Sequence, residues 1–231
     1  MELEKIWISI SLVIFSYLFG SIPTGYLIGK WIKKVDLRDF GSGTVSGSMV
    51  FEHIAKWAVV PVGLFDIFKG ALTTWLSIRL GIGEIMGVIC GLVSVVGHNW
   101  PIYLQFHGGR GLSPFIGMLL ILFPWGCFLL LAALAIGFFL GDSAPFAILT
   151  IALMPFIVNL FDGPAIIGWL AIGMAGITVI KRVEANRRPL PSNLNHRIKV
   201  ILLRIFFDRD ITDHQSWISQ FPSDKTSLIK Q

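Results

Sequence analysis

The sequence GHNWPIYLQFHGGRG, residues Gly97–Gly111, decides how the chain folds, because it places polar and flexible residues between two strongly apolar runs. It contains His98, His107 and Arg110 and ends in a Gly-Gly-Arg-Gly turn. At membrane depth, irregular backbone is tolerated only where protein buries it or where it lines a wet cavity. Ionisable side chains there are costly and by default mark a functional site. We therefore expect a membrane protein with a site built around this segment.

The composition of the whole chain agrees with that expectation. Apolar residues make up 54% of the sequence, charged residues 14%, and the mean hydropathy is +0.74, which is outside the range of soluble globular domains. Runs apolar enough to cross a bilayer lie at Ile6–Gly29, Trp57–Arg79, Ile85–Trp100, Ser143–Phe161 and Gly163–Ile180. The uncharged run Gly111–Gly141 is too long for one span, and Pro124 near its middle predicts two short helices. The predicted fold is all-α and polytopic, with about seven transmembrane helices, some short or interrupted.

The positions of the basic residues predict the orientation of these helices. One basic cluster follows the first span and another follows the last: Lys30, Lys33, Lys34 and Arg38, then Lys181, Arg182, Arg187, Arg188, Arg197, Lys199 and Arg204. Both clusters should be cytoplasmic, which requires an odd number of spans and an N-terminus outside. The Gly97–Gly111 segment then also faces the cytoplasm. The net charge of +5 follows from these flanking residues and requires no nucleic-acid partner.

The chain is predicted to have two parts. Residues 1–188 form the membrane domain, and residues 189–231 form a cytoplasmic tail. In the tail, Arg197–Phe207 mixes basic and apolar residues at helical spacing, which predicts an amphipathic helix in the membrane interface. Asp208–Gln231 is polar, and we expect it to be loose.

A glycine- and hydroxyl-rich loop, FGSGTVSGS at Phe40–Ser48, precedes the second span. It carries Ser42, Thr44, Ser46 and Ser48 at every second position. Such a loop can direct N–H groups and hydroxyls at an anion. The alternative is a plain loop with a serine cap for the next helix.

Asp66 and Lys69 interrupt the second span from one face of its helix. In the functional interpretation, Lys69 contacts a phosphate and Asp66 orients it. The alternative is an ion pair that neutralises itself, or a lysine that snorkels to the interface.

In the Gly97–Gly111 segment, Arg110 lies between glycines. A guanidinium suits bidentate recognition of phosphate or carboxylate, and Gly108, Gly109 and Gly111 would let a ligand approach the backbone. His98 is either a general base or a hydrogen-bonded structural residue. The sequence contains no metal-binding triad, nucleophile elbow or nucleotide motif, and Cys90 and Cys127 lie inside apolar runs without metal-ligand spacing. The three clusters together suit a ligand with a phosphate end and an aliphatic end.

These motifs, in this order, resemble the PlsY family of bacterial membrane acyltransferases, from about Ile14 to Arg188. The resemblance rests on GSIPTGYLIGK at Gly20–Lys30, VDLRDFGSG at Val35–Gly43, FDIFKG at Phe65–Gly70 and GHNWPIYLQFHGGRG at Gly97–Gly111. It implies a seven-helix protein of the bacterial inner (plasma) membrane with its active site at the cytoplasmic face. It also implies transfer of an acyl group from acyl phosphate to glycerol 3-phosphate, giving lysophosphatidic acid, with no metal and no other cofactor. Partners would be these two substrates and membrane lipids; the oligomeric state stays open.

The resemblance implies site residues position by position. Ser42 and Gly43 match the start of the first motif, Lys69 and Gly70 the second, and Gly97, His98, Pro101, Gly108, Gly109 and Gly111 the third. We predict catalytic roles for Ser42, Lys69, His98 and Arg110, with a substrate phosphate as the alternative base to His98. The predicted substrate-binding residues are Gly43, Thr44, Ser48, Gly108, Gly109, Gly111 and Arg182.

The chain also departs from the family pattern. Thr44 replaces an Asn, Ser46-Gly47-Ser48-Met49 replaces Gly-Ala-Thr-Asn, and Arg110 replaces a Lys. Glu52 stands where the family has an Arg, and Arg182 and Ala185 stand where a His and an Asn are expected. These changes keep two other hypotheses open: a catalytically impaired paralogue that binds acyl or phosphate lipids as a regulator, and a small organic-anion transporter.

Overall fold

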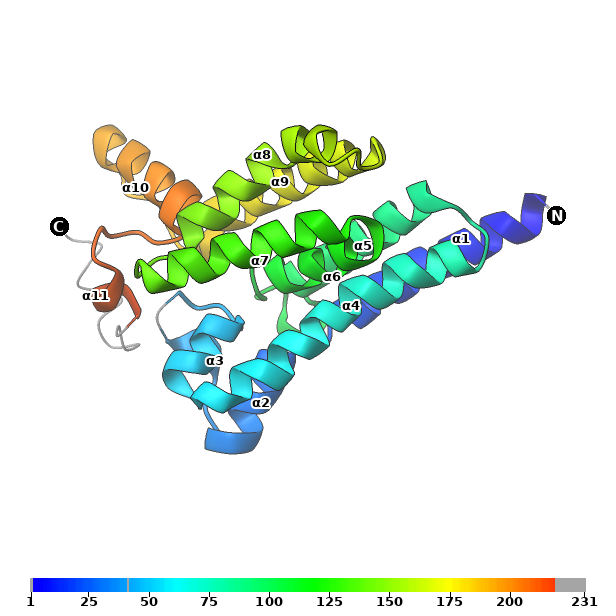
Figure 1. Cartoon of the computed structure of the whole chain (residues 1–231). Coiled ribbons are helices and arrows are strands. Elements are labelled where there is room, and N and C mark those ends of the chain that lie inside the picture. Colours follow the sequence, from blue (N-terminus) through cyan, green and yellow to red (C-terminus); the bar gives the residue numbers. More distant parts are fainter. Residues whose placement is uncertain (1, 41, 219–231) are drawn as a thin grey trace.

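The computed structural model describes residues 2–40 and 42–218, and the regular structure of these residues is entirely helical (Figure 1). The α-helices are α1 (Glu2–Gly20), α2 (Thr24–Lys33), α3 (Gly47–His53), α4 (Val59–Arg79), α5 (Glu84–Asn99), α6 (Leu112–Leu122), α7 (Pro124–Phe139), α8 (Ala144–Leu160), α9 (Ile166–Glu184), α10 (Leu194–Phe207) and α11 (His214–Ile218). Short 3₁₀ turns lie at η1 (Leu37–Asp39), η2 (Lys56–Ala58), η3 (Ile102–Leu104) and η4 (Ala185–Arg187). The all-α prediction is confirmed.

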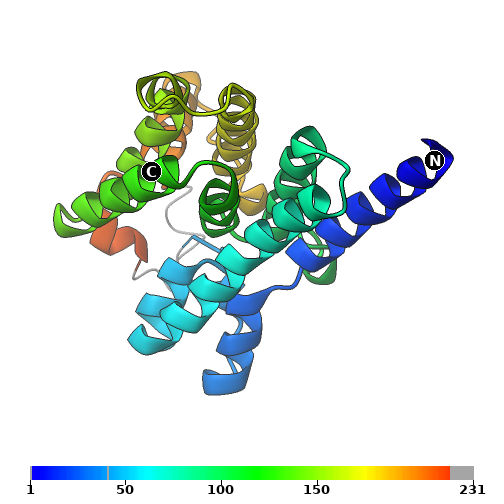
Figure 2. The same cartoon turned by 45° about the vertical axis from the view of Figure 1, so that its right-hand side comes forward.

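The predicted membrane segments are present. Long apolar helical segments cover Leu3–Lys33, Lys56–Arg79, Glu84–Leu104 and Ile166–Glu184, and α6, α7 and α8 are shorter apolar helices. Within the described residues these make up the seven apolar segments that the sequence predicts. The N-terminus and the α4–α5 connection lie at one end of the bundle, whereas α3, α10 and α11 lie at the other end (Figures 1 and 2).

The first span differs from its prediction as one helix over Ile6–Gly29, because it breaks between α1 and α2. Pro23 has no N–H to donate and adopts φ −90° and ψ 76°, so the helical hydrogen bonds are interrupted there. The break is filled from α4. The Lys69 ammonium donates to the Ile22 carbonyl at 2.5 Å, and the Thr24 hydroxyl donates to the Asp66 carboxylate at 3.0 Å. The irregular backbone is thus satisfied inside the protein, as its depth requires.

The predicted division of Gly111–Gly141 into two short helices is confirmed. The chain turns at Phe123, where φ is −155° and ψ is 78°, and α7 begins with Pro124. Proline is favourable at a first helical position because that residue has no intrahelical N–H partner.

Glycine–backbone contacts bring the helices of the bundle close together. A Cβ on Gly70 of α4 would lie 1.8 Å from the Pro114 carbonyl oxygen of α6, and one on Gly117 would lie 2.0 Å from the Ile67 carbonyl oxygen. Small residues that allow such approach are a common means of joining helices in lipid, where apolar packing alone gives little selectivity.

The C-terminal segment is more ordered than the sequence predicts. The amphipathic helix is present as α10, which begins at Leu194 and is capped by the Asn193 side chain. The expectation of a loose chain from Asp208 is wrong for the described part, Asp208–Ile218. Asp208 pairs with Arg110 and Arg209 pairs with Asp142, so this part is held against the membrane domain. Residues 219–231 lie outside the described residues.

The α4–α6 contact yields a prediction about stability. Gly70→Ala should destabilise the protein by about 1–3 kcal/mol, because its methyl group would collide with backbone that cannot move independently. Gly63→Ala is the matched control on the same helix, since a Cβ there meets no atom within 4 Å. Thermal unfolding in detergent measures both variants. Equal midpoints for Gly70→Ala and wild type would contradict the close crossing.

Candidate active site

Three polar segments meet at the Asn186 side chain. Its Nδ2 donates to the Gly43 carbonyl at 2.7 Å and, more weakly, to the Gly108 carbonyl at 3.5 Å. The Val45 N–H also donates to the Gly108 carbonyl, at 3.4 Å. These bonds join the Phe40–Ser48 loop, the Gly97–Gly111 segment and the end of α9. We call this meeting point, defined by Gly43, Gly108 and Asn186, the junction.

A left-handed turn after α9 directs Asn186 into the junction. Ala185 and Asn186 have φ values of 45° and 52°. Asparagine tolerates this conformation, whereas it costs alanine roughly 1–2 kcal/mol. Lys181 Nζ donates to Asn186 Oδ1 at 2.8 Å. Because an ammonium can only donate, this bond turns the amide NH₂ of Asn186 toward the two carbonyls.

Lys181 is a site residue that the sequence analysis missed. Its side chain is fully buried, its ammonium lies 3.1 Å from Glu184 Oε2 and 4.9 Å from the centre of the Trp100 ring. The neighbouring Arg182, which was predicted to bind substrate, points elsewhere because adjacent helical residues are rotated by about 100°. A lysine in the last turn of a membrane helix was the available signal for Lys181.

Arg182, predicted to bind substrate, holds the tail in place instead. It is buried and donates to the carbonyls of Ile205 and Phe206 on α10 and of Ala144 on α8. These bonds use both of its terminal nitrogens, so the structure assigns Arg182 to packing rather than to the junction.

The hydroxyls of the Phe40–Ser48 loop form a continuous row. Oxygen–oxygen distances are 2.7 Å from Ser42 to Thr44, 2.9 Å from Thr44 to Ser46 and 3.0 Å from Ser46 to Ser48. Ser42, next to Gly43, lies at the junction end, Thr44 is buried and Ser48 is exposed. Ser46 occupies the cap position of α3 but makes no side-chain cap bond, so the simple capping alternative does not describe this loop.

Two guanidinium groups adjoin the junction. Arg110 donates from Nε to Asp208 Oδ2 at 2.8 Å and from Nη1 to the Lys181 carbonyl at 3.1 Å. Arg188 lies over the Trp217 ring, 4.3 Å from its centre, and a Cβ on Gly43 would be 3.8 Å from its Nη2. Burial lowers the pKa of Arg188 to about 10, so it remains cationic at neutral pH. The junction is therefore suited to a phosphate.

Lys69 and His98 form a buried layer with Asp66. The Lys69 side chain has no exposed surface, and its ammonium lies 2.6 Å from Asp66 Oδ1. His98 Nδ1 lies 3.6 Å from the same carboxylate oxygen, and the opposite, Nε2 edge of the ring faces Gly109. Lys69 thus forms the ion pair with Asp66 that the second interpretation describes, and His98 lies beside the same carboxylate.

The sequence of the chain is similar to a known protein family and to individual members of it. A profile of the family described as glycerol-3-phosphate acyltransferase matches residues 10–191. The chain is 34% identical over 218 residues to glycerol-3-phosphate acyltransferase 5 of Dehalococcoides mccartyi, covering 91% of this chain and 93% of the relative. It is 41% identical over 109 residues to glycerol-3-phosphate acyltransferase of Gloeobacter violaceus, covering 46% of this chain and 53% of the relative. This chain belongs to the glycerol-3-phosphate acyltransferase family.

Solved structures are similar as well. The fold matches a crystal structure of PlsY, an integral membrane glycerol 3-phosphate acyltransferase, in its glycerol 3-phosphate form, with TM-score 0.69 and 29% identity over 78% of this chain and 90% of that one. The lysophosphatidic acid form matches with TM-score 0.67 and 28% identity, at the same coverage. These comparisons support the acyltransferase hypothesis over a lipid-binding regulator or a transporter.

The glycines of the third family motif serve packing in this acyltransferase. A Cβ on Gly108 would lie 2.3 Å from the His98 carbonyl oxygen, and one on Gly109 would lie 2.1 Å from His98 Nε2. Gly111 has φ +75° and faces Val95 and Asn99. The side on which a Cβ would lie at Gly109 and at Gly111 is therefore filled by α5, and the Gly108 carbonyl lies in the junction.

Glu52, at the position where the resemblance leads us to expect an arginine, is exposed on α3, which ends at His53. Its carboxylate is therefore solvated, which weakens its electrostatic effect on distant charges.

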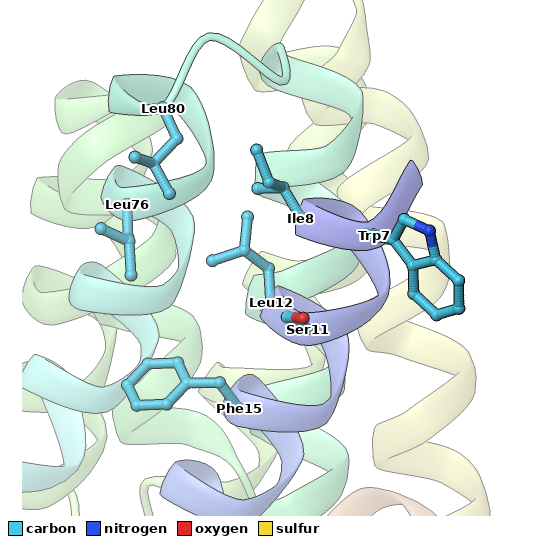
Figure 3. A pocket seen from close by; sticks show the side chains of 7 residues that line it. All are labelled: Trp7, Ile8, Ser11, Leu12, Phe15, Leu76 and Leu80. Carbon is cyan, nitrogen blue, oxygen red and sulfur yellow. The ribbon is translucent and has the colours of Figure 1, made fainter. Parts of the chain in front are cut away.

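An apolar surface pocket lies far from the junction. Figure 3 shows it between α1 and α4, lined by Trp7, Ile8, Ser11, Leu12, Phe15, Leu76 and Leu80. These residues belong to the end of the bundle that carries the N-terminus (Figure 1). Its nearly apolar lining suits lipid hydrocarbon rather than the polar substrate ends. Within residues 2–40 and 42–218, no group of three or more His, Cys, Asp or Glu side chains could hold a metal ion.

The buried layer yields a prediction that separates its two interpretations. Lys69→Met should destabilise the protein by about 3–5 kcal/mol, because it leaves the Asp66 charge buried without its ammonium partner. Adding Asp66→Asn should recover part of this loss. Lys56→Met, which removes an exposed lysine next to the same helix, is the control. Thermal unfolding gives the stability, and a kinetic assay gives the KM for glycerol 3-phosphate. Unchanged stability of Lys69→Met with a raised KM would instead support the interpretation in which Lys69 contacts the substrate phosphate.

Proposed function

We propose that this family member transfers an acyl group from acyl phosphate to glycerol 3-phosphate and releases lysophosphatidic acid and phosphate. The observation that carries the proposal is the junction, where the Ser42 loop, Arg110 and Arg188 meet around Asn186. Support comes from the family and from the substrate and product named for the solved PlsY structures.

The chemistry needs little beyond position and charge. Acyl phosphate carries its own leaving group, so the protein must align the glycerol hydroxyl with the carbonyl carbon and stabilise the negative charge that develops. The new C–O ester bond forms as the bond from the carbonyl carbon to the phosphate oxygen breaks. The hydroxyl proton ends on phosphate, which gives hydrogen phosphate and balances the reaction.

Each junction residue has a proposed role. Arg110 and Arg188 bind the two substrate phosphates, because guanidinium groups form charge-assisted hydrogen bonds with phosphate. The Ser42 hydroxyl, held by Thr44, donates to phosphate or to the developing oxyanion. Asn186 positions the Gly43 and Gly108 backbone. With His98 enclosed beside Asp66, a substrate phosphate is the proposed base.

We also propose that the bundle lies in the bacterial inner membrane with the junction and the C-terminus in the cytoplasm. The basic residues around α2 and after α9 support this orientation. The exposed apolar residues of α10 support its location in the membrane interface: Leu194, Ile198, Leu202 and Phe206 follow one face, next to the exposed Arg197 and Lys199.

The phosphate role of Arg110 predicts a kinetic defect. Arg110→Ala should lower kcat/KM for acyl phosphate at least tenfold, since a charge-assisted hydrogen bond contributes about 1.5–3 kcal/mol. Arg79→Ala, an exposed arginine at the end of α4, should leave it unchanged. Formation of labelled lysophosphatidic acid by purified protein measures both. Absence of product with folded wild type would overturn the proposed function itself.

The orientation predicts which cysteines a membrane-impermeant thiol reagent reaches in intact cells. The native Cys90 and Cys127 are buried, so single exposed cysteines can be read against a low background. Leu3→Cys should be labelled from outside, and Ser216→Cys only after the membrane is opened. The reverse pattern would place the junction on the wrong side of the membrane for the proposed substrates.

A further inference from the structure

The C-terminal segment beyond the family profile lies directly against the active site. The profile ends at residue 191, and the segment from residue 192 forms α10, α11 and the turn between them, at the end of the bundle where α3 also lies (Figure 1). Three of its side chains contact the backbone or the guanidinium groups next to the junction. They are Arg204, Asp208 and Trp217.

Two of these contacts brace the backbone after α9. Arg204 is buried and donates from Nη1 to the Val183 carbonyl at 2.8 Å and to the Arg188 carbonyl at 3.4 Å. Its Nε is held at 2.6 Å by Asp210. Trp217 is also buried and lies under the Arg188 guanidinium. The segment thus fixes both ends of the turn that carries Asn186.

The third contact acts on Arg110 itself. Asp208 Oδ2 accepts from Arg110 Nε at 2.8 Å, while the Lys181 carbonyl accepts from Nη1 at 3.1 Å. Two acceptors on different nitrogens define the plane of the guanidinium. Within the described part of the chain, Nη2 makes no hydrogen bond, and the side chain remains 14% exposed. The group is therefore oriented, with one donor nitrogen still available.

The conformation of Asp208 fits this task. It ends α10 in the left-handed region, with φ +56°, which directs the chain away from the helix axis. Buried Arg182 donates to the carbonyls of Ile205 and Phe206 just before it. The carboxylate is consequently presented to Arg110 by a fixed backbone rather than by a flexible tail.

We propose that Asp208 is a positioning residue of the active site, which orients the Arg110 guanidinium for phosphate, so that the C-terminal segment is an integral part of the site. This proposal rests on the proposed function in assigning phosphate to Arg110. A carboxylate that competed with phosphate would be expected to cover the donors of the guanidinium, whereas Asp208 takes only Nε. Preorganised ligands supported by a second layer of hydrogen bonds bind more tightly than free side chains.

The test compares two aspartates with the same backbone conformation. Asp208→Gly removes the carboxylate at a left-handed position that glycine adopts without strain. Asp162→Gly is the matched control, since Asp162 has φ +48°, is exposed and lies between α8 and α9 at the other end of α9. Arg110→Ala and the Arg110→Ala/Asp208→Gly double variant complete a double-mutant cycle.

The measurement is the binding of inorganic phosphate, followed by ³¹P NMR with the full chain in a maltoside detergent, which contains no phosphorus. The KM for acyl phosphate is measured in parallel.

Asp208→Gly should weaken phosphate binding about tenfold, a size common for partners that orient a binding group, and should raise the KM for acyl phosphate more than it changes kcat. In the Arg110→Ala background the same substitution should have no further effect on phosphate affinity. Asp162→Gly should behave as wild type. These results support the proposal if the thermal midpoints show that each variant is still folded.

Other results overturn it. Tighter phosphate binding by Asp208→Gly would show that the carboxylate competes with substrate. Unchanged binding, or an equal loss with and without Arg110, would show that Asp208 does not act through Arg110. If phosphate binding depends on Asp208 and Arg110 as expected but the wild type forms no lysophosphatidic acid, the positioning role is supported and the proposed function is wrong. Wild type that binds no phosphate would overturn both.

Discussion

The site depends on one amide. Asn186 accepts from the buried Lys181 and donates to the backbone of Gly43 and Gly108, and so joins three segments that are far apart in the sequence. Each segment alone is an ordinary polar interruption of an apolar chain. Joined, they place a serine hydroxyl and two guanidinium groups around one point. The amide is held in one orientation because a lysine can only donate and a carbonyl can only accept.

A second buried layer, formed around Asp66, adjoins the third motif and accounts for the burial of several motif residues. Asp66 gathers Lys69, Thr24 and His98 around one carboxylate. This layer fills the break in the first span and fixes the end of α5, against which the glycines of the third motif pack. In a membrane, an unsatisfied carbonyl at the break would be costly, so charged residues in a span can serve to support a site as well as to perform chemistry.

Hydrophobicity predicted the spans and their order well, because crossing a bilayer imposes a length and a composition on every helix. The predicted division at Pro124 follows from the same reasoning.

The site was predicted less completely. Position along the chain identified the loops of Ser42 and Arg110, but the direction of each side chain around its helix decided between Lys181 and Arg182, and that direction depends on packing. Similarly, a glycine-rich motif is compatible with ligand approach or with close helix packing, and only the neighbours of Gly109 and Gly111 distinguish the two. The contacts of Asp208 and Arg204 depend on where α10 docks, which a polar tail sequence does not reveal.

The central claim is that Asn186 unites the three segments into one acyl-transfer site. Asn186→Gly tests it most directly, because glycine retains the left-handed turn at φ 52° while removing the amide. The measurement is kcat/KM for lysophosphatidic acid formation from acyl phosphate and glycerol 3-phosphate, with helical content followed by circular dichroism. A loss of at least tenfold is expected, with helical content unchanged, since three hydrogen bonds of about 1 kcal/mol each are lost. A variant with wild-type kcat/KM would contradict it.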